Sequence, residues 1–250
     1  MGFQRMQLNT FSIVARCPRS GMLGVAVSTA VPAVGALCPY VKTGVGAVST
    51  QSWVNPYLAI DALRLMEAGL EASAALDRVL ADDDAKGLRQ IGVVDAAGRS
   101  VAWTGGGCTP WHGHITERDV AIQGNMLVGE ATLSAMAEAF RRSESLDLAE
   151  RLLLALEAGQ AAGGDKRGKQ SAALRVHHTE DYPWLDLRVD EHRYPVAELR
   201  RVYTIARLQL LPFVEGMPKR GAAAGALPGP VEDMLLTPPP FRPGGGGSAP

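Results

Sequence analysis

The chain has 250 residues, which is enough for one large domain or two small ones, and 46% of them are hydrophobic, so it can bury a sizeable core. Its formal net charge of −1 gives no basic excess to attract nucleic acid or an anionic membrane, and no apolar run is long enough to span a bilayer. The first nine residues lack the apolar core of a signal peptide and the three cysteines form no even disulfide framework, so we expect a soluble cytoplasmic protein.

Strands are predicted first along the chain, because apolar residues alternate with polar or small ones. The predicted strands are Thr10–Arg16, Leu23–Ser28 and Val45–Gln51. Residues 17–21 offer the proline and glycine that a hairpin turn favours, and the glycine- and proline-rich residues 31–40 connect the second strand to the third. Two helices follow, at Pro56–Ala68 and Ala72–Leu80, where apolar residues repeat at helical spacing.

The second half of the chain repeats this order. Its predicted strands are Gln90–Val94, Ser100–Thr104, Val120–Gln123, Ser171–His177 and Trp184–Val189, and its predicted helices are Ala131–Arg142, Leu146–Ala161 and Val196–Leu210. Asp95-Ala96-Ala97-Gly98 is a hairpin signal between the first two of these strands. This order favours an α+β fold of two packed antiparallel sheets, each with a helix layer outside it, over a doubly wound parallel sheet.

The composition changes near residue 213, where alanine, glycine and proline dominate. Such sequence buries little apolar area against its conformational entropy, so residues 212–250 are predicted to be a disordered tail. The short apolar motif at residues 231–236 could still dock on the fold. Residues 10–211 are then expected to form a single domain, preceded by an N-terminal extension of residues 1–9.

Thr10 begins the first predicted strand, close to the start of the chain. A threonine at a chain terminus can act as a nucleophile with its own α-amino group as the base, because a free α-amine titrates at about pH 7.7–8 and accepts the hydroxyl proton. The other interpretation is a β-branched residue that opens a strand, which is a common use of threonine.

Five segments form a distinctive set: Thr10-Phe11-Ser12-Ile13-Val14-Ala15-Arg16, Gly24-Val25-Ala26-Val27-Ser28, Gly44-Val45-Gly46-Ala47-Val48, Gln123-Gly124-Asn125, and the glycine–aspartate motif at residues 159–171. Together they resemble the domain of unknown function 1028 family, over the length from Thr10 to about Leu208. That family is placed in the N-terminal nucleophile (Ntn) hydrolase superfamily. The resemblance therefore implies a four-layer αββα sandwich, hydrolysis of an amide bond and assembly into a homo-oligomer.

The resemblance also implies roles for two residues. Thr10 matches the nucleophile that attacks a carbonyl while its amine shuttles the proton. Lys42 is similar in placement to a lysine that lowers the proton affinity of the nucleophile in proteasome-type members, although a solvated loop lysine is the other interpretation.

The sequence before Thr10 departs from the family, whose members usually begin with Met-Thr. Here residues 1–9 precede Thr10, so the chain cleaves itself between Asn9 and Thr10, the gene start is misassigned, or the nucleophile is never freed.

Three further residues are candidates for the same site. Asp165 could hold the α-ammonium group of a freed Thr10, or it could fix its loop by pairing with Arg167. Ser171 could support Thr10 by hydrogen bonding, or simply open a strand. Asn125 could stabilise a tetrahedral oxyanion, or it could cap the helix that follows.

Residues 105–114 suggest a rival chemistry. Cys108, His112 and His114 are residue types that zinc favours, but their spacing matches no closed zinc site and no fourth ligand is evident. We therefore expect no metal and no cofactor. The function predicted from the sequence is hydrolysis of a small amide or short peptide, and the alternative is a non-catalytic binding or scaffold protein in which Thr10 stays blocked.

Overall fold

The computed structural model describes residues 10–222, 225 and 227–236. The chain divides into two compact units, Met1–Arg200 and Arg201–Pro250. Within the described residues it is a mixed α/β chain with two antiparallel sheets and seven α-helices. The predicted extension of residues 1–9 lies outside the described part.

The larger sheet has six strands and lies in the first unit. Its spatial order is β10 (Leu185–Val189), β9 (Ser171–His177), β2 (Leu23–Thr29), β1 (Thr10–Arg16), β8 (Val120–Gly124) and β7 (Gly113–Glu117). Every neighbouring pair is antiparallel. Strand β1 is central, so both of its edges are hydrogen-bonded.

The smaller sheet has four strands in the order β3 (Pro39–Lys42), β4 (Gly46–Ser52), β5 (Arg89–Asp95) and β6 (Ser100–Thr104), again all antiparallel. It packs against the larger sheet, because β1 contacts both β4 and β5 and β8 contacts β5. Between the sheets lies an apolar cluster that includes Val14, Val25, Ala47 and Val94.

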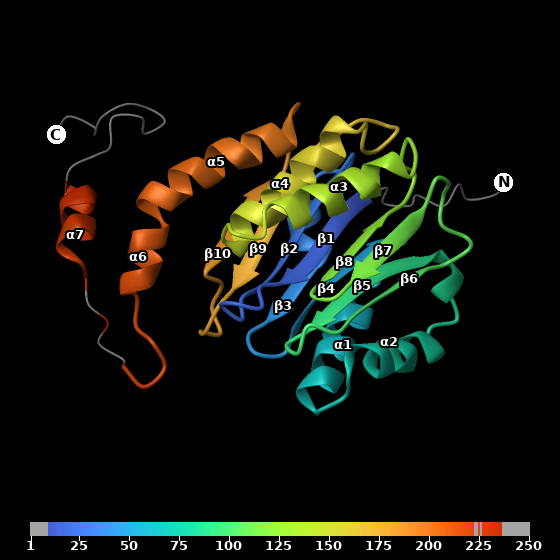
Figure 1. Ribbon diagram of the computed structural model, residues 1–250, viewed down its shortest axis with the longest axis horizontal. Coiled ribbons are helices and arrows are strands. Elements are labelled where there is room, and N and C mark those ends of the chain that lie inside the picture. Colours follow the sequence, from blue (N-terminus) through green and yellow to red (C-terminus); the bar gives the residue numbers. More distant parts are fainter. Residues whose placement is uncertain (1–9, 223–224, 226, 237–250) are drawn as a thin grey trace. The chain divides into compact units, whose positions relative to one another are not determined.

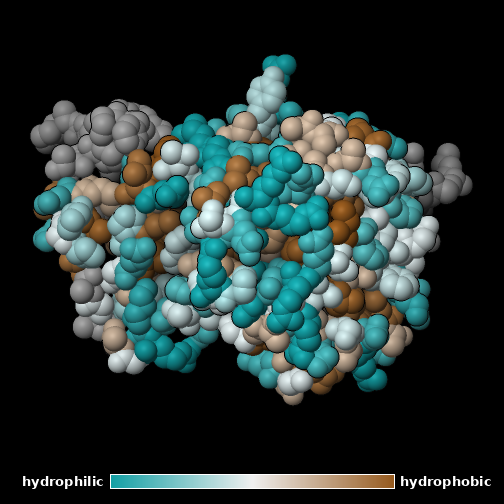
Figure 2. Space-filling model, in the orientation of Figure 1, coloured by the Kyte–Doolittle hydropathy of each residue, from teal (hydrophilic) through white to brown (hydrophobic). Residues whose placement is uncertain are grey.

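Two pairs of helices cover these sheets (Figure 1). Helices α1 (Pro56–Glu67) and α2 (Ala72–Ala81) pack on the four-stranded sheet, whereas α3 (Ala131–Arg142) and α4 (Leu148–Ala161) pack on the six-stranded one. Each helix turns an apolar face to its sheet, as its spacing predicts. Over α3 and α4, Figure 2 shows mainly hydrophilic side chains, with hydrophobic residues in small separate patches.

Strand β1 has two different faces. Phe11 points to the helices, since a Cβ at Gly159 of α4 would lie 3.1 Å from the Phe11 ring. Ser12 points the other way and donates a hydrogen bond to Gln51 of the four-stranded sheet. Because side chains alternate along a strand, Thr10 shares the inward face with Ser12.

Most predicted elements are present with boundaries within two residues. Two strands were missed: β3, which lies at the end of the glycine- and proline-rich connection, and β7, which lies in the segment considered for metal ligation. Both are short edge strands, and their pairing partners rather than their own composition define them.

The second unit is helical in its described part. Helix α5 (Pro195–Gln209) enters it from the first unit, and α6 (Leu211–Gly216) and α7 (Gly229–Leu236) follow. Helix α7 and all but the first residue of α6 lie in residues 212–250, where the sequence predicts disorder. The high proline and glycine content of this segment predicts disorder, but short apolar stretches within it form helices. Leu211, Val214 and Val231 of these helices are buried. No helix in the described part of the chain is long and apolar enough to cross a membrane.

Candidate functional site

Thr10 opens β1 and is fully buried. Its Oγ1 donates a hydrogen bond to Oγ1 of Thr29, its partner on β2, over 3.3 Å. Its carbonyl oxygen accepts two hydrogen bonds, one from the backbone N–H of Asn125 (3.0 Å) and one from Nε2 of Gln51 (3.1 Å). The start of β1 is therefore fixed by groups from both sheets.

Ser171 lies in line with Thr10 across the sheet. Thr10 pairs with Thr29, and Thr29 pairs with Ser171, so the three side chains share one face. The Ser171 hydroxyl donates to the carbonyl of Val31 (2.6 Å) and accepts from the N–H of Val34 (3.1 Å). Strand β2 separates Ser171 from β1, and these bonds of its hydroxyl order residues 31–34 rather than Thr10.

Asp165 holds the loop after α4 in place. Its carboxylate accepts hydrogen bonds from the N–H of Ala30 (3.3 Å), the N–H of Arg167 (2.8 Å) and the Arg167 guanidinium (3.1 Å). The side chain is almost completely buried. Of the two interpretations of the sequence, the pairing with Arg167 is present in the structure. The carboxylate also binds Ala30, the residue after Thr29, which is the strand partner of Thr10.

The loop that carries Asp165 joins the two strands on either side of β1. On one side, the N–H of Lys166 donates to the carbonyl of Met126, just after β8. On the other, the N–H of Gln170 donates to the carbonyl of Thr29 in β2. Because both attachments lie at the end of the sheet where Thr10 begins, the loop belongs to the same site.

Four buried polar residues between the sheets complete the surroundings of Thr10. They are Ser12, Gln51, Gln90 and Gln123, and none has exposed surface. The Ser12 hydroxyl donates to Gln51 Oε1 (2.6 Å) and accepts from Gln123 Nε2 (2.6 Å), while Gln51 Nε2 also donates to Gln90 Oε1 (2.8 Å). The carboxamide of Gln123 occupies the space above Gly92, where a Cβ atom would lie 2.1 Å from its Oε1.

Sequence reasoning missed these four residues. The signal that could have found them is the presence of amide side chains on strands that are otherwise apolar, at positions facing the partner sheet. Buried amides need hydrogen-bond partners, so several of them facing the space between the sheets would have indicated a network.

Asn125 contacts this network from the end of β8. Its Nδ2 donates to Gln90 Oε1 (2.9 Å), and its Oδ1 is buried without a hydrogen-bond partner among the described residues. An oxyanion role would use the second hydrogen on Nδ2, because the backbone N–H already binds Thr10. This Oδ1 is an acceptor within the Thr10 site, and a buried acceptor without a partner calls for an explanation such as a catalytic role.

We expect Gln51→Met to lower the free energy of unfolding by about 1–3 kcal/mol, because the buried Ser12 hydroxyl then loses its acceptor. Urea unfolding of Gln51→Met, Ser12→Ala and the double variant measures the coupling between the two residues. The double variant should cost less than the two single changes together, and strict additivity would contradict the hydrogen bond.

Lys42 is not brought to Thr10. It pairs with Gly46 at one end of the four-stranded sheet, five residues along β4 from Gln51, which is about 17 Å at strand spacing. Its ammonium group is exposed and forms an ion pair with Glu67 of α1 (2.5 Å). The pairing of β3 with β4, which places Lys42 opposite Gly46, explains the difference from the expected placement.

The segment considered for metal ligation lies beside the site but is engaged otherwise. Cys108 Sγ donates to the carbonyl of Arg89 (3.3 Å), and burial raises the pKa of this thiol. His114 Nδ1 shares a hydrogen bond with Thr104 Oγ1 (2.9 Å), and burial lowers its pKa. No group of three potential ligands in the described part of the chain is placed to hold a metal ion.

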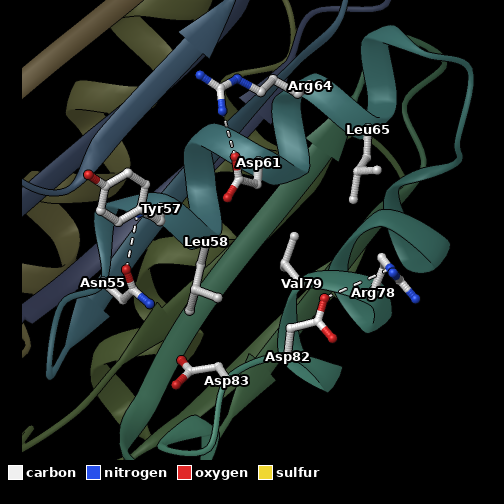
Figure 3. Close-up of a pocket in the computed structure, with 10 residues that line it drawn as sticks. All are labelled: Asn55, Tyr57, Leu58, Asp61, Arg64, Leu65, Arg78, Val79, Asp82 and Asp83. Carbon is white, nitrogen blue, oxygen red and sulfur yellow. Dashed lines mark hydrogen bonds and ion pairs between the residues drawn. The ribbon is translucent and has the colours of Figure 1, made fainter.

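A pocket of about 460 Å³ lies elsewhere, between α1 and α2 (Figure 3). Its charged side chains are paired with one another: Asp61 with Arg64 (2.9 Å), and Arg78 with Asp82 (3.9 Å). Asp83 at its edge binds Arg89, and that hydrogen bond holds the pKa of the carboxyl below its usual value. None of the residues around Thr10 lines this pocket.

A family model and one solved structure point to the same family. The family described as "Family of unknown function (DUF1028)" matches residues 10–199. The crystal structure of a Silicibacter pomeroyi protein with the same family designation is 28% identical, with a TM-score of 0.80 over 88% of this chain and 100% of that chain. The ancestral β-subunit Anbu from Yersinia bercovieri gives 13% identity and a TM-score of 0.36, over 84% of this chain and 99% of that chain. The comparison with curated proteins gives no match.

Proposed function

Since the chain belongs to the DUF1028 family of unknown function, whose match begins at Thr10, we propose that it is an amide hydrolase of the Ntn type with Thr10 as its nucleophile. In this proposal the bond between Asn9 and Thr10 is cut, and Thr10 becomes the first residue of the active protein. The substrate is a small amide or a short peptide.

The environment of Thr10 is the observation that carries the proposal. Its carbonyl is held by donors from Asn125 and Gln51, and its hydroxyl is held by Thr29. A chain cut immediately before Thr10 would therefore keep its new terminus in place, because these contacts involve Thr10 itself and not the residues before it. Fixed geometry of this kind is what a nucleophile requires.

The cut would proceed in two balanced steps. Thr10 Oγ1 adds to the carbonyl carbon of Asn9 and passes its proton to the leaving nitrogen as the C–N bond breaks, which leaves an ester and a free α-amine. Water then hydrolyses the ester, releasing residues 1–9 with an Asn9 carboxylate and restoring the Thr10 hydroxyl.

The same groups would serve the reaction with substrate. The free α-amine of Thr10 takes the hydroxyl proton as Oγ1 attacks the amide carbonyl, and it returns the proton to the leaving amine. Water cleaves the resulting ester. Asn125 Nδ2 is the candidate donor to the tetrahedral oxyanion, and its unpartnered Oδ1 is an acceptor for an N–H group of the substrate or of the new α-ammonium. Asp165 is the candidate counter-charge for that ammonium.

The finer fold assignment belongs to the same proposal. Two antiparallel sheets in contact, each covered by a helix pair, support the four-layer αββα sandwich of Ntn hydrolases. Thr10 begins the central strand β1 at a point where the partner sheet contacts it, which suits the role of nucleophile.

One observation favours the alternative, a non-catalytic protein that uses the same fold for binding. Lys42, the cation expected to activate Thr10, is paired with Glu67 at the opposite end of the four-stranded sheet from Gln51. Without Lys42 beside it, Thr10 would depend on its free α-amine to activate the hydroxyl.

Intact-mass measurement with N-terminal sequencing of freshly purified wild-type protein tests the proposal. We expect a mass lower by residues 1–9 and a sequence that begins Thr-Phe-Ser. Full-length mass in both fresh and aged samples, with no hydrolysis of a panel of small amides, would instead favour the binding protein.

A further inference from the structure

The second candidate site is a cavity at the opposite end of β1 from Thr10. Six residue steps of strand separate the two ends, about 20 Å. The cavity has a volume of about 350 Å³ and lies among the turn after β1, the turn between β7 and β8, and the ends of α3 and α4. Its feature of interest is Arg151 of α4, which lines it and is only 6% exposed.

The guanidinium group of Arg151 is buried with little compensation. Its Cζ lies 3.8 Å from the centre of the Phe140 ring, and its Nη2 donates a long hydrogen bond of 3.3 Å to the Phe140 carbonyl. Its Nε is buried and has no partner among the described residues. The Phe140 carbonyl, near the end of α3, also accepts a hydrogen bond from Ser143 Oγ (3.1 Å). Capping of α3 therefore does not by itself account for a buried cation here.

A comparison with Arg89 shows what is absent. Arg89 is also buried, and its guanidinium binds both carboxylate oxygens of Asp83, at 2.7 and 3.2 Å. No carboxylate in the described part of the chain lies within 4.0 Å of the Arg151 guanidinium. Burial accordingly lowers the pKa of Arg151. An unpaired buried charge is costly, and a bound anion would remove that cost.

The other charges of the cavity leave room for such an anion. Glu117 is paired with Arg141 (3.3 Å), and Asp119 is paired with Arg16 (2.9 Å). Glu144 also lines the cavity and is exposed. Glu117 and Asp119 are thus paired with arginines other than Arg151, and Arg118 at the opening lies 4.0 Å from Asp119.

We propose that this cavity binds a small oxyanion, a carboxylate or a phosphate, through the guanidinium group of Arg151. The planar fork of N–H groups matches two oxygens of either anion, which makes arginine the usual residue for such recognition. The site is separate from Thr10 and does not depend on the proposed hydrolase activity.

Titration with inorganic phosphate and with acetate at constant ionic strength tests the proposal, using calorimetry and thermal unfolding on the full chain. We expect a saturable heat of binding and a concentration-dependent rise in Tm for wild type with at least one anion. Competition between the two identifies which chemistry the site prefers. Arg151→Met should weaken binding about ten- to a hundredfold, the loss expected for a charge-assisted pair.

Two control variants make the outcome decisive. Arg142→Met removes an exposed arginine of α3 that pairs with Glu138 and does not line the cavity, and it should bind as wild type does. Arg151→Lys keeps a buried cation but loses the fork, and it should bind more weakly than wild type even if Arg151→Met fails to fold. Absence of saturable binding to wild type at millimolar anion, or equal binding by wild type and Arg151→Lys, would overturn the proposal.

Discussion

The Thr10→Ala variant is expected to keep residues 1–9 attached under conditions in which the wild-type protein has lost them. Without the hydroxyl there is no atom to add to the Asn9 carbonyl, so the effect should be complete rather than graded. Intact-mass spectrometry of both proteins over several days, beginning immediately after purification, measures it.

Thr10→Ser is the matched control for this experiment. Serine keeps the hydroxyl and loses only a methyl group, so it should release residues 1–9 at a measurable rate. Cleavage of Thr10→Ala at the same bond would show that another protease makes the cut. Retention of residues 1–9 by all three proteins would contradict self-cleavage and favour the binding protein with Thr10 blocked.

Acid is expected to destabilise the first unit through His177. Burial, helped by the neighbouring Arg175, lowers the pKa of this histidine from 6.5 to about 4, while Asp181 opposes the shift. The hydrogen bonds explain why the neutral ring is preferred. Thr43 Oγ1 donates to the Glu180 carbonyl, so it accepts from Nδ1–H, and Nε2 accepts from Arg175 Nε.

The sign of the effect follows from the lowered pKa. Between pH 6.5 and pH 4 the unfolded chain binds a proton that folded His177 does not, so stability falls as the pH falls through this window. The loss should approach about 3 kcal/mol at pH 4 relative to pH 7.5. Urea unfolding across this range measures it.

His177→Gln should flatten this part of the pH profile, because glutamine does not titrate. His178→Gln, at the next position in the chain, is the control and should leave the profile as in wild type. An unchanged slope between pH 6.5 and 4 in His177→Gln would contradict the assignment of the loss to His177.

Local sequence predicted the strands and helices because each has a repeat that its own residues display. The strand at residues 10–16 and the helix at residues 131–142 begin and end where alternation or helical spacing does. Strands β3 and β7 were missed because each has only four or five residues and lies at a sheet edge, where its neighbour supplies the hydrogen bonds that define it.

The structure places some of the predicted site residues together and others apart. Thr10, Asn125 and Asp165 do meet at one end of the six-stranded sheet, since strand pairing brings their segments together. Lys42 does not, because its distance from Thr10 depends on the register of β3 and on how the two sheets pack. Those are relations between distant segments, and a single sequence displays them weakly.

Gln51 and Gln90 were missed for a related reason. Each reads as an ordinary polar residue near the end of a strand, and only the packing of one sheet on the other turns it into a buried partner of Thr10 and Asn125. Buried amides indicate a hydrogen-bond network only when the sheet that packs against them is known.

Gly92 has no side chain, and this couples the residue types that positions 92 and 123 can carry. Any side chain at residue 92 would occupy the space of the Gln123 carboxamide, which in turn would release Ser12 from its donor. A homologue with alanine or a larger residue at position 92 is therefore expected to carry a shorter residue at position 123. A substitution at only one of the two positions would disturb the hydrogen bonds between Gln123 and Ser12 beside the Thr10 site, with no change at Thr10 itself.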